Sequence, residues 1–297
     1  MNVSVIGCNG YIGKHLSMFL LEKGWDVYGY DISAESKVNG INYTSLELRK
    51  KDDVNKINLN VDFIFYFAGV TGTAKSYEEY DLYIDVNEKA LLHILERMKK
   101  EKVTGRIIYP STRLVYKGKK NIPLKEEDQK EFKTLYALNK WFGENVIKQY
   151  SDYFGINYNI FRICVPYGNM FNDIYSYGTI GFMLSNAIAK KNITIFGQGE
   201  QRRTFSHIED ICSQVYCVIN KEKTVNQIYN ISGENISIIE AAVKIANKYN
   251  VNVEKIDWPE LEKKMESGDT IFDASKILSE IEVRQKHYFN EWVDKNE

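Results

Sequence analysis

The feature that most constrains the fold of this chain is its first segment, where an apolar run passes directly into three regularly spaced glycines. The run NVSVI precedes Gly7, Gly10 and Gly13, which follow the pattern G-x-x-G-x-x-G. Residues 11–23 then show the apolar spacing of a helix. A helix that leaves a strand through such a turn packs back onto the sheet, so the segment predicts an α/β protein.

Strand and helix patterns alternate through the first half of the chain. This alternation is typical of a parallel sheet covered on both faces, and it predicts a Rossmann-like, doubly wound α/β fold. After about Pro166, glycine-rich and polar segments separate shorter helices, which favours a smaller α+β C-terminal portion. We expect one domain over residues 1–165, to which later segments return, and a second portion over residues 166–297. Further strands are predicted over 25–31, 61–69, 105–111 and 157–168, and further helices over 83–100, 137–154 and 237–250.

Composition excludes several classes of partner. A formal net charge of −1 gives no global basic field, so we expect no nucleic-acid partner. The chain has no apolar stretch of about 18 residues and no basic signal-peptide start, so we expect no membrane partner. The cysteines at 8, 164, 212 and 217 lack metal-ligand spacing, so we expect no metal site. Scattered thiols suit a reducing compartment, which predicts a cytoplasmic protein.

The glycines and an acidic residue at the end of the next predicted strand form the pattern of a dinucleotide site. Gly7 allows a tight turn, Gly10 lets the backbone approach a pyrophosphate, and Gly13 lets the helix pack closely on the strand. Asp31 follows Gly13 by 18 residues, near the spacing of about 20 expected of an acid that binds the adenosine ribose. Such a carboxylate repels a 2′-phosphate, so NAD is favoured over NADP. The alternative is a glycine-rich turn that binds no ligand.

A second pattern, Tyr136-x-x-x-Lys140, places a phenol and an ammonium one helical turn apart. A phenol is a poor base at neutral pH, because its ordinary pKa is about 10. A neighbouring ammonium stabilises the phenolate and makes the tyrosine usable as a general base. The pattern also occurs by chance, and the alternative is a solvated tyrosine beside a lysine.

Several motifs in one order resemble the extended short-chain dehydrogenase/reductase family, in its nucleotide-sugar epimerase/dehydratase type, to which UDP-glucose 4-epimerase belongs. The resemblance covers nearly the whole chain. Besides the glycine and Tyr-x-x-x-Lys patterns, it rests on DVNEKALL at 85–92, PSTRLVY at 110–116, GQGEQRRTF at 197–205, HIEDI at 207–211 and YNISG at 229–233.

The resemblance implies roles for individual residues. Thr112 would hydrogen-bond the reacting sugar hydroxyl, Tyr136 would exchange its proton, and Lys140 would also hold the nicotinamide ribose. Arg203 would grip the sugar nucleotide's pyrophosphate, whereas Arg202 is expected at the surface. The implied NAD-binding residues are Gly7, Gly10, Tyr11, Ile12, Gly13, Asp31, Ile32, Phe67, Ala68, Gly69, Asn87, Tyr136 and Lys140, and the implied substrate-binding residues are Thr112, Arg113, Val165, Phe196 and Arg203.

The resemblance leaves three functions open. A 4,6-dehydratase is disfavoured, because Arg113 and Leu114 stand where that enzyme carries an acid pair. We expect an NAD-dependent epimerase that acts at sugar C4 through a transient 4-keto intermediate. The alternative is a nucleotide-4-keto-6-deoxysugar reductase that uses NAD(P)H. Val165 favours it, because this residue stands where many epimerases and dehydratases of the family carry an asparagine. A catalytically silent NAD(P)-binding regulator or scaffold is the third reading, although such members usually lose the tyrosine or the lysine.

The expected partner is a nucleotide sugar whose base the sequence does not specify, in a pathway of carbohydrate biosynthesis. Family members often form dimers through two helices of each subunit. Here those helices would cover Asp85–Lys100 and Tyr136–Tyr150, and we expect a homodimer.

Overall fold

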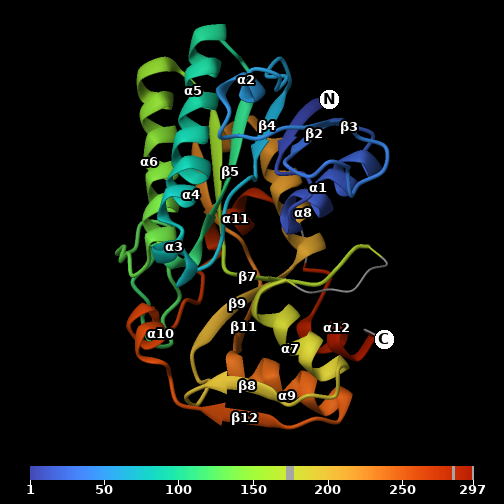
Figure 1. Ribbon diagram of the computed structural model, residues 1–297, viewed down its shortest axis with the longest axis vertical. Helices are drawn as coiled ribbons and strands as arrows, with labels where there is room; N and C mark the ends of the chain where they lie inside the picture. Colours follow the sequence, from blue (N-terminus) through green and yellow to red (C-terminus); the bar gives the residue numbers. More distant parts are fainter. Residues whose placement is uncertain (172–176, 283–284, 296–297) are drawn as a thin grey trace. The chain divides into compact units, whose positions relative to one another are not determined.

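The computed structural model describes residues 1–171, 177–282 and 285–295 (Figure 1). The chain forms two compact units, each built from segments far apart in the sequence. Whether one unit binds NAD and the other the substrate, as expected for 1–165 and 166–297, stays a prediction. The first unit comprises Met1–Val115, Thr134–Arg162 and Ile219–Tyr229, and the second comprises Tyr116–Lys133, Ile163–Val218 and Asn230–Glu297.

A seven-stranded sheet of order β10-β6-β5-β4-β1-β2-β3 organises the first unit. The neighbours from β3 through β2, β1 and β4 to β5 all pair in parallel. The chain lays β2 and β3 on one side of β1, and then returns to lay β4 and β5 on the other. This is the predicted doubly wound α/β fold, which is confirmed. The strands are β1 (Asn2–Ile6), β2 (Asp26–Asp31), β3 (Asn42–Ser45), β4 (Phe63–Tyr66), β5 (Arg106–Thr112), β6 (Tyr158–Ile163) and β10 (Gln227–Asn230).

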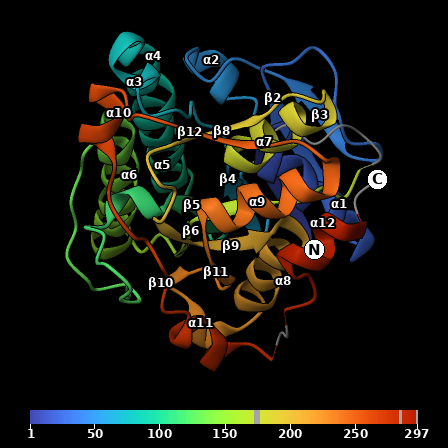
Figure 2. The same cartoon turned by 90° about the horizontal axis from the view of Figure 1, so that it is seen from below.

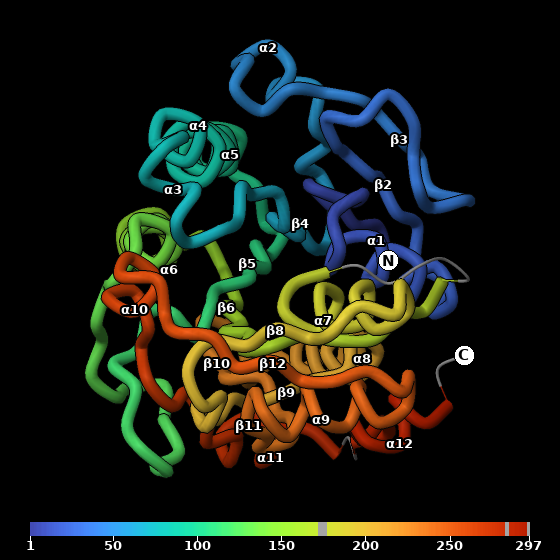
Figure 3. Tube along the Cα trace, turned by 60° about the horizontal axis from the view of Figure 1, so that its bottom comes forward, coloured from blue at the N-terminus to red at the C-terminus, as the bar shows by residue number. Residues whose placement is uncertain are grey.

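Helices cover both faces of this sheet, as the fully buried strands β4 and β5 require. Alternate residues such as Ile64 and Tyr66 pack in one apolar cluster with Leu91 and Ile147, which lie on α5 and α6. In Figures 1 and 3, α4, α5 and α6 lie on one side of the sheet and α1 on the other. The helices are α1 (Tyr11–Glu22), α2 (Lys51–Val54), α3 (Lys75–Glu78), α4 (Tyr80–Ile84), α5 (Ala90–Glu101) and α6 (Leu135–Phe154), with 3₁₀ turns at Arg113–Val115 and Glu222–Thr224.

The helix predicted over 83–100 is interrupted. Residues Asp85–Lys89 form a π-helical turn between α4 and α5. Single π-turns inside helices are frequent at functional sites. The apolar spacing of the segment resembles that of an ordinary helix, which is why the sequence did not reveal the turn.

The single strand predicted over 157–168 is wrong. The segment splits at Cys164 into β6, which belongs to the seven-stranded sheet, and β7 (Val165–Tyr167), which pairs with β9 (Arg202–His207). The sheet order β11-β9-β7 places β7 at an edge. Proline lacks an N–H for a central ladder, so Pro166 fits this edge position. The apolar run hides the break, because both strands are largely buried.

The second unit contains the three-stranded sheet β11-β9-β7 and the parallel pair β8 and β12. Helices α7 and α9 pack on each other and on β8, and Figure 2 shows α9 along this pair. Among the described residues, no helix has both the length and the apolar character needed to cross a membrane. The elements are β8 (Ile193–Phe196), β11 (Glu234–Ser237), β12 (Val253–Ile256), α7 (Gly178–Ile188), α8 (Ile208–Ile219), α9 (Ile238–Tyr249), α10 (Glu260–Met265), α11 (Ser275–Glu280) and α12 (Phe289–Lys295).

A buried ion pair joins α6 to β6 inside the first unit. The Glu144 carboxylate accepts hydrogen bonds from Arg162 Nε at 2.9 Å, Arg162 Nη2 at 2.6 Å and Ser111 Oγ at 2.5 Å. Both side chains of the pair are almost completely buried. Removal of one partner of such a pair is costly, because a buried charge loses its counter-ion.

We therefore expect Glu144→Ala to lower the free energy of unfolding by about 3–5 kcal/mol, measured by urea denaturation. The matched control is Glu291→Ala, which breaks the exposed pair with Lys295 and should leave stability nearly unchanged. A loss below about 1 kcal/mol for Glu144→Ala would contradict the stabilising role of the buried pair.

Candidate active site

The turn after β1 and the first turn of α1 approach each other so closely that the positions of Gly7 and Gly13 accept only glycine. Gly7 has a φ of +87°, and a Cβ there would lie 2.4 Å from the backbone N of Ala68. A Cβ on Gly13 would lie 2.1 Å from the carbonyl oxygen of Gly7. The first turn of α1 is thus held against the turn, with Tyr11 and Ile12 between Gly10 and Gly13. Within the described part of the chain no side chain caps this helix, so its N-terminal dipole stays directed at the turn.

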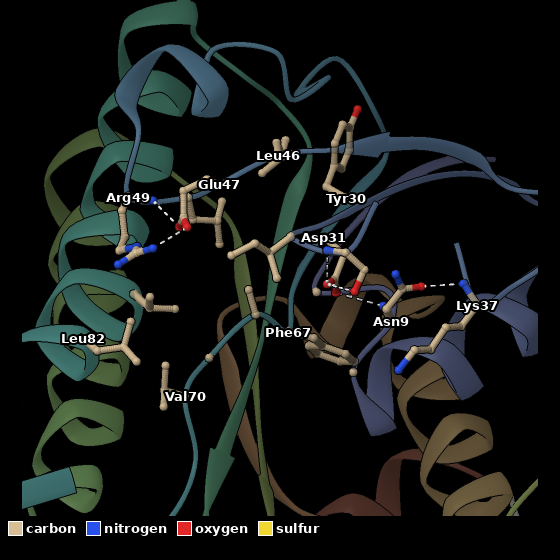
Figure 4. A pocket seen from close by; sticks show the side chains of 18 residues that line it. Asn9, Tyr30, Asp31, Lys37, Leu46, Glu47, Arg49, Phe67, Val70 and Leu82 are labelled. Carbon is tan, nitrogen blue, oxygen red and sulfur yellow. Dashed lines mark hydrogen bonds and ion pairs between the residues drawn. The ribbon is translucent and has the colours of Figure 1, made fainter. Parts of the chain in front are cut away.

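A cavity of about 440 Å³ opens at the carboxyl ends of β1, β2, β3 and β4 (Figure 4). This is the place where the strand order reverses, and open α/β sheets bind ligands there. Residues from all four strand ends line it, together with Leu82 and Val86. Of the predicted NAD-binding residues, Gly7, Gly10, Asp31, Ile32, Phe67, Ala68 and Gly69 line the cavity.

Asp31 lies at the end of β2 with its carboxylate fixed by backbone groups. Its Oδ2 accepts a hydrogen bond from the Asn9 N–H at 3.0 Å, and its Oδ1 accepts one from the Ser33 N–H at 3.3 Å. The Asn9 side chain accepts a hydrogen bond from the Lys37 N–H and donates one to the Glu35 carbonyl. Asn9 therefore joins the glycine turn to the loop after β2, as Figure 4 shows for Lys37.

Sequence reasoning missed several of the residues that line this cavity. Asn9 stands inside the glycine pattern at a position that the pattern leaves unspecified. Glu47 and Arg49 follow β3 and form an ion pair at 2.6 Å at the edge of the cavity. No spacing in the sequence points to this pair, because only the sheet order brings the end of β3 beside β2. The missed lining residues are Asn9, Tyr30, Ser33, Lys37, Leu46, Glu47, Leu48, Arg49, Val70, Leu82 and Val86.

Asn87 and Lys140 lie beside the chain that follows β4. Asn87, in the π-helical turn, accepts a hydrogen bond from the Val70 N–H at 2.8 Å and donates one to the Val70 carbonyl at 3.0 Å. A Cβ on Gly69 would lie 3.1 Å from Asn87 Oδ1 and 3.8 Å from Lys140 Nζ. Gly69 therefore keeps room between the two side chains, and Asn87 fixes the backbone past them.

The Lys140 ammonium is buried and donates a hydrogen bond to the Pro110 carbonyl at 3.0 Å. Its Nζ also lies 4.7 Å from the centre of the Tyr109 ring. Burial lowers the pKa of Lys140 to about 8, and the negative charge of Glu144 opposes this shift. At neutral pH the lysine is therefore mostly charged, but it can lose its proton far more easily than a surface lysine.

Tyr136 and Thr112 belong to the elements that hold Lys140. Tyr136 lies in the first turn of α6, whose cap is Thr134, which accepts a hydrogen bond from the Ala137 N–H. Thr112 ends β5, and its hydroxyl accepts a hydrogen bond from the Leu114 N–H at 3.3 Å. Arg113 begins the 3₁₀ turn that follows. The first unit thus contains all three residues predicted to be catalytic.

The other predicted substrate-binding residues lie in the second unit. Val165 begins β7 and is buried, and Phe196 ends β8, where its ring packs on Trp258 at 5.2 Å between centres. Arg203 lies in β9 and pairs with Glu266. Arg202 pairs with Glu240 and is partly exposed, in keeping with its expected place at the surface.

The described residues include one group with the composition of a metal site. Ligand atoms of His207, Glu209 and His287 all lie within 4.8 Å of one another. Glu209 already contacts His287 Nε2 at 2.9 Å and Lys286 Nζ at 3.4 Å. The imidazole rings of His207 and His287 stack face to face with centres 3.9 Å apart. That the protein binds no metal stays a prediction.

Comparison with known proteins identifies the class. The model of the NAD-dependent epimerase/dehydratase family matches residues 3–232, and the chain belongs to this family. The predicted family is therefore confirmed, and NAD is the cofactor by which the family is defined.

Its relatives are named for several different reactions. A putative UDP-glucose 4-epimerase from Methanocaldococcus jannaschii is 27% identical, over 77% of this chain and 80% of that protein. CDP-paratose 2-epimerase from Salmonella typhi is 24% identical, over 99% and 98%. A dTDP-4-dehydro-6-deoxy-D-allose reductase from Streptomyces is 27% identical, over 81% and 79%. The solved UDP-glucose 4-epimerase of Thermus thermophilus, in complex with NAD, has a TM-score of 0.87 at 20% identity over 99% and 97% of the two chains, and this shows the fold alone.

We expect Lys140→Met to stabilise the protein by about 3 kcal/mol at pH 7, because the burial of the ammonium costs that much for a pKa lowered from 10.5 to about 8. The folded pKa lies below the unfolded one, so the cost is complete below pH 8. It disappears as the pH rises towards 10.5. Urea unfolding at pH 7 and pH 10 measures the difference between variant and wild type. A difference that does not shrink at pH 10 would contradict the lowered pKa.

Proposed function

We propose that this protein is a nucleotide-sugar epimerase that acts at sugar C4 and keeps NAD tightly bound. One observation carries the proposal: the buried ammonium of Lys140 lies beside Gly69 and Asn87, one helical turn after Tyr136. This arrangement belongs to the unit that also contains the glycine turn and Asp31. Buried cations with a lowered pKa cluster at functional sites, and an ammonium one turn from a tyrosine can stabilise the phenolate that proton exchange requires.

The residues of the cavity fit a dinucleotide. A side chain on Gly7 or Gly13 would collide with backbone atoms, so the turn stays bare for a pyrophosphate at the N-terminus of α1. Asp31, held by the N–H groups of Asn9 and Ser33, presents its carboxylate where a ribose would bind. When bound, NAD would supply the group that accepts a hydride from sugar C4 and returns it.

In this proposal the protein's own residues move and hold the proton. Tyr136 would take the proton of the C4 hydroxyl and later return it, while the charge of Lys140 lowers the cost of the phenolate. The Thr112 hydroxyl, at the end of the buried strand β5, would orient the sugar hydroxyl. Hydride return to the opposite face of the sugar would invert C4 without a net change in redox state.

A reductase is the second candidate, which Val165 and the reductase relative support.

The first experiment is to purify the protein without added cofactor, denature it and identify any released nucleotide by chromatography. Stoichiometric NAD or NADH is the expected result, because an epimerase recycles its cofactor in place. An empty site that binds NADPH more tightly than NADH would overturn the proposal in favour of a reductase.

We expect Tyr136→Phe to reduce turnover of a nucleotide sugar by about 10²–10⁴-fold, because the variant keeps the ring but loses the proton. NAD binding, measured by fluorescence quenching, should remain nearly unchanged. The control is Tyr153→Phe on the same helix, whose ring is 77% exposed and which should keep full activity. Near-normal turnover by Tyr136→Phe would show that another group serves as the base.

The base of the nucleotide, the homodimer through the two helices named above and the cytoplasmic location also belong to this proposal. Assays with UDP-, dTDP-, GDP- and CDP-sugars would identify the base. Analysis of the sugar product would distinguish inversion at C4 from inversion at C2, the reaction named for the Salmonella relative.

A further inference from the structure

Arg203, on strand β9 of the second unit, is a buried cation whose two terminal nitrogens, Nη1 and Nη2, already have hydrogen-bond partners. Its side chain is 2% exposed. Nη2 donates to the Glu266 carboxylate at 2.5 Å, and Nη1 donates to the carbonyls of Gly268 and Arg202. Arginine stays charged at all physiological pH values, so this site always requires an anion.

The anion that satisfies Arg203 lies on the solvent side. The Glu266 side chain is 24% exposed and lines an open cavity of about 490 Å³, whereas Arg203 does not line it. Glu266 therefore separates the guanidinium from the cavity. The cavity is also lined by Lys117, Gly118, Glu131, Lys133, Gln201, Trp258, Lys263, Ser267 and Gly268.

The contacts of the Glu266 carboxylate resemble those of a bound phosphate oxygen. Its Oε1 accepts hydrogen bonds from Arg203 Nη2 at 2.5 Å and from the backbone N–H of Gly268 at 2.9 Å. A guanidinium and a backbone N–H that converge on one oxygen are the donors that bind phosphate in proteins. Lys117, Lys133 and Lys263 surround the cavity with further positive charge.

The other acid of the cavity has a different partner. Glu131 pairs with Lys133 at 3.5 Å, so it neutralises a lysine at the cavity wall. Glu266, by contrast, forms its ion pair with Arg203. The two glutamates thus contribute equal charge to the cavity, but only one of them occupies the donors of a buried arginine. This difference provides a matched control.

We infer that Glu266 is a built-in competitor for the diphosphate of the substrate and determines how tightly it binds. The inference rests on the proposed function, because a nucleotide sugar supplies the diphosphate. The carboxylate must leave Arg203 and the Gly268 N–H before a phosphate oxygen can take its place. Binding is therefore an exchange of anions, and the affinity for a diphosphate is lower than a free arginine would give.

The test is a calorimetric titration of the full chain with inorganic pyrophosphate, which carries the shared anion without a base or a sugar. Glu266→Gln keeps an oxygen for the same donors but removes the competing charge, and we expect it to bind pyrophosphate at least about tenfold more tightly than wild type. Glu131→Gln removes the same charge from the cavity and should change the affinity less than about threefold. Glu266→Ala should also tighten binding, and it replaces Glu266→Gln if that variant fails to fold.

Equal or weaker binding by Glu266→Gln would overturn the inference, and so would equal tightening by both glutamine variants, which would indicate a general charge effect. Thermal unfolding distinguishes this role from a purely structural one. If the Arg203–Glu266 pair were only structural, its loss would lower the stability of the protein without raising its affinity for pyrophosphate. A different result would contradict the proposed function, namely that the wild-type protein converts no nucleotide sugar. If wild type converts the sugar and Glu266→Gln shows no tightening, the inference alone is wrong.

Discussion

The rest of the first unit depends on the approach of helix α1 to the turn that precedes it. The carbonyl oxygen of Gly7 lies where a Cβ of Gly13 would stand, and the backbone of Ala68 lies where a Cβ of Gly7 would stand. Three segments, the ends of β1 and β4 and the start of α1, are therefore in backbone contact. Their closeness fixes the cavity edge without any side chain, which keeps peptide N–H groups and a helix dipole available for an anion.

Helix α6 carries the second group of constraints. Tyr136, Lys140 and Glu144 follow one another at intervals of one turn, so they share a face of the helix. Glu144 is bound by Arg162 and Ser111, and its charge favours the ammonium of Lys140. The cost of keeping a lysine charged in the interior is thus partly offset by a carboxylate that is itself fully bonded. The burial of Lys140 lowers the stability of the fold and also lowers the pKa of its ammonium group. Lowered pKa values of this kind cluster at functional sites.

The sequence predicted those parts of the molecule that depend on local pattern. The glycine turn and the Tyr-x-x-x-Lys spacing are short local patterns. The fold followed from the alternation of strand and helix patterns, and the family from several such motifs in one order along the chain. The residues that escaped prediction depend on contacts between distant segments. Arg49 reaches the cavity because β3 pairs beside β2, and Glu266 reaches Arg203 across more than sixty positions of the chain. The break at Cys164 escaped prediction because the residues of β6 and β7 form one continuous, largely buried run, and the sequence does not mark where the chain changes sheet.

Because of the π-helical turn at Asp85–Lys89, the position of Asn87 depends on the exact number of residues in this segment. Such a turn accommodates one residue more than the α-helices that flank it, and a residue corresponds to about 100° of rotation about the helix axis. A lineage that deleted one residue from this segment would recover a regular helix, but Asn87 would point away from Val70. Gaps should be rarer here than in any surface loop of comparable exposure.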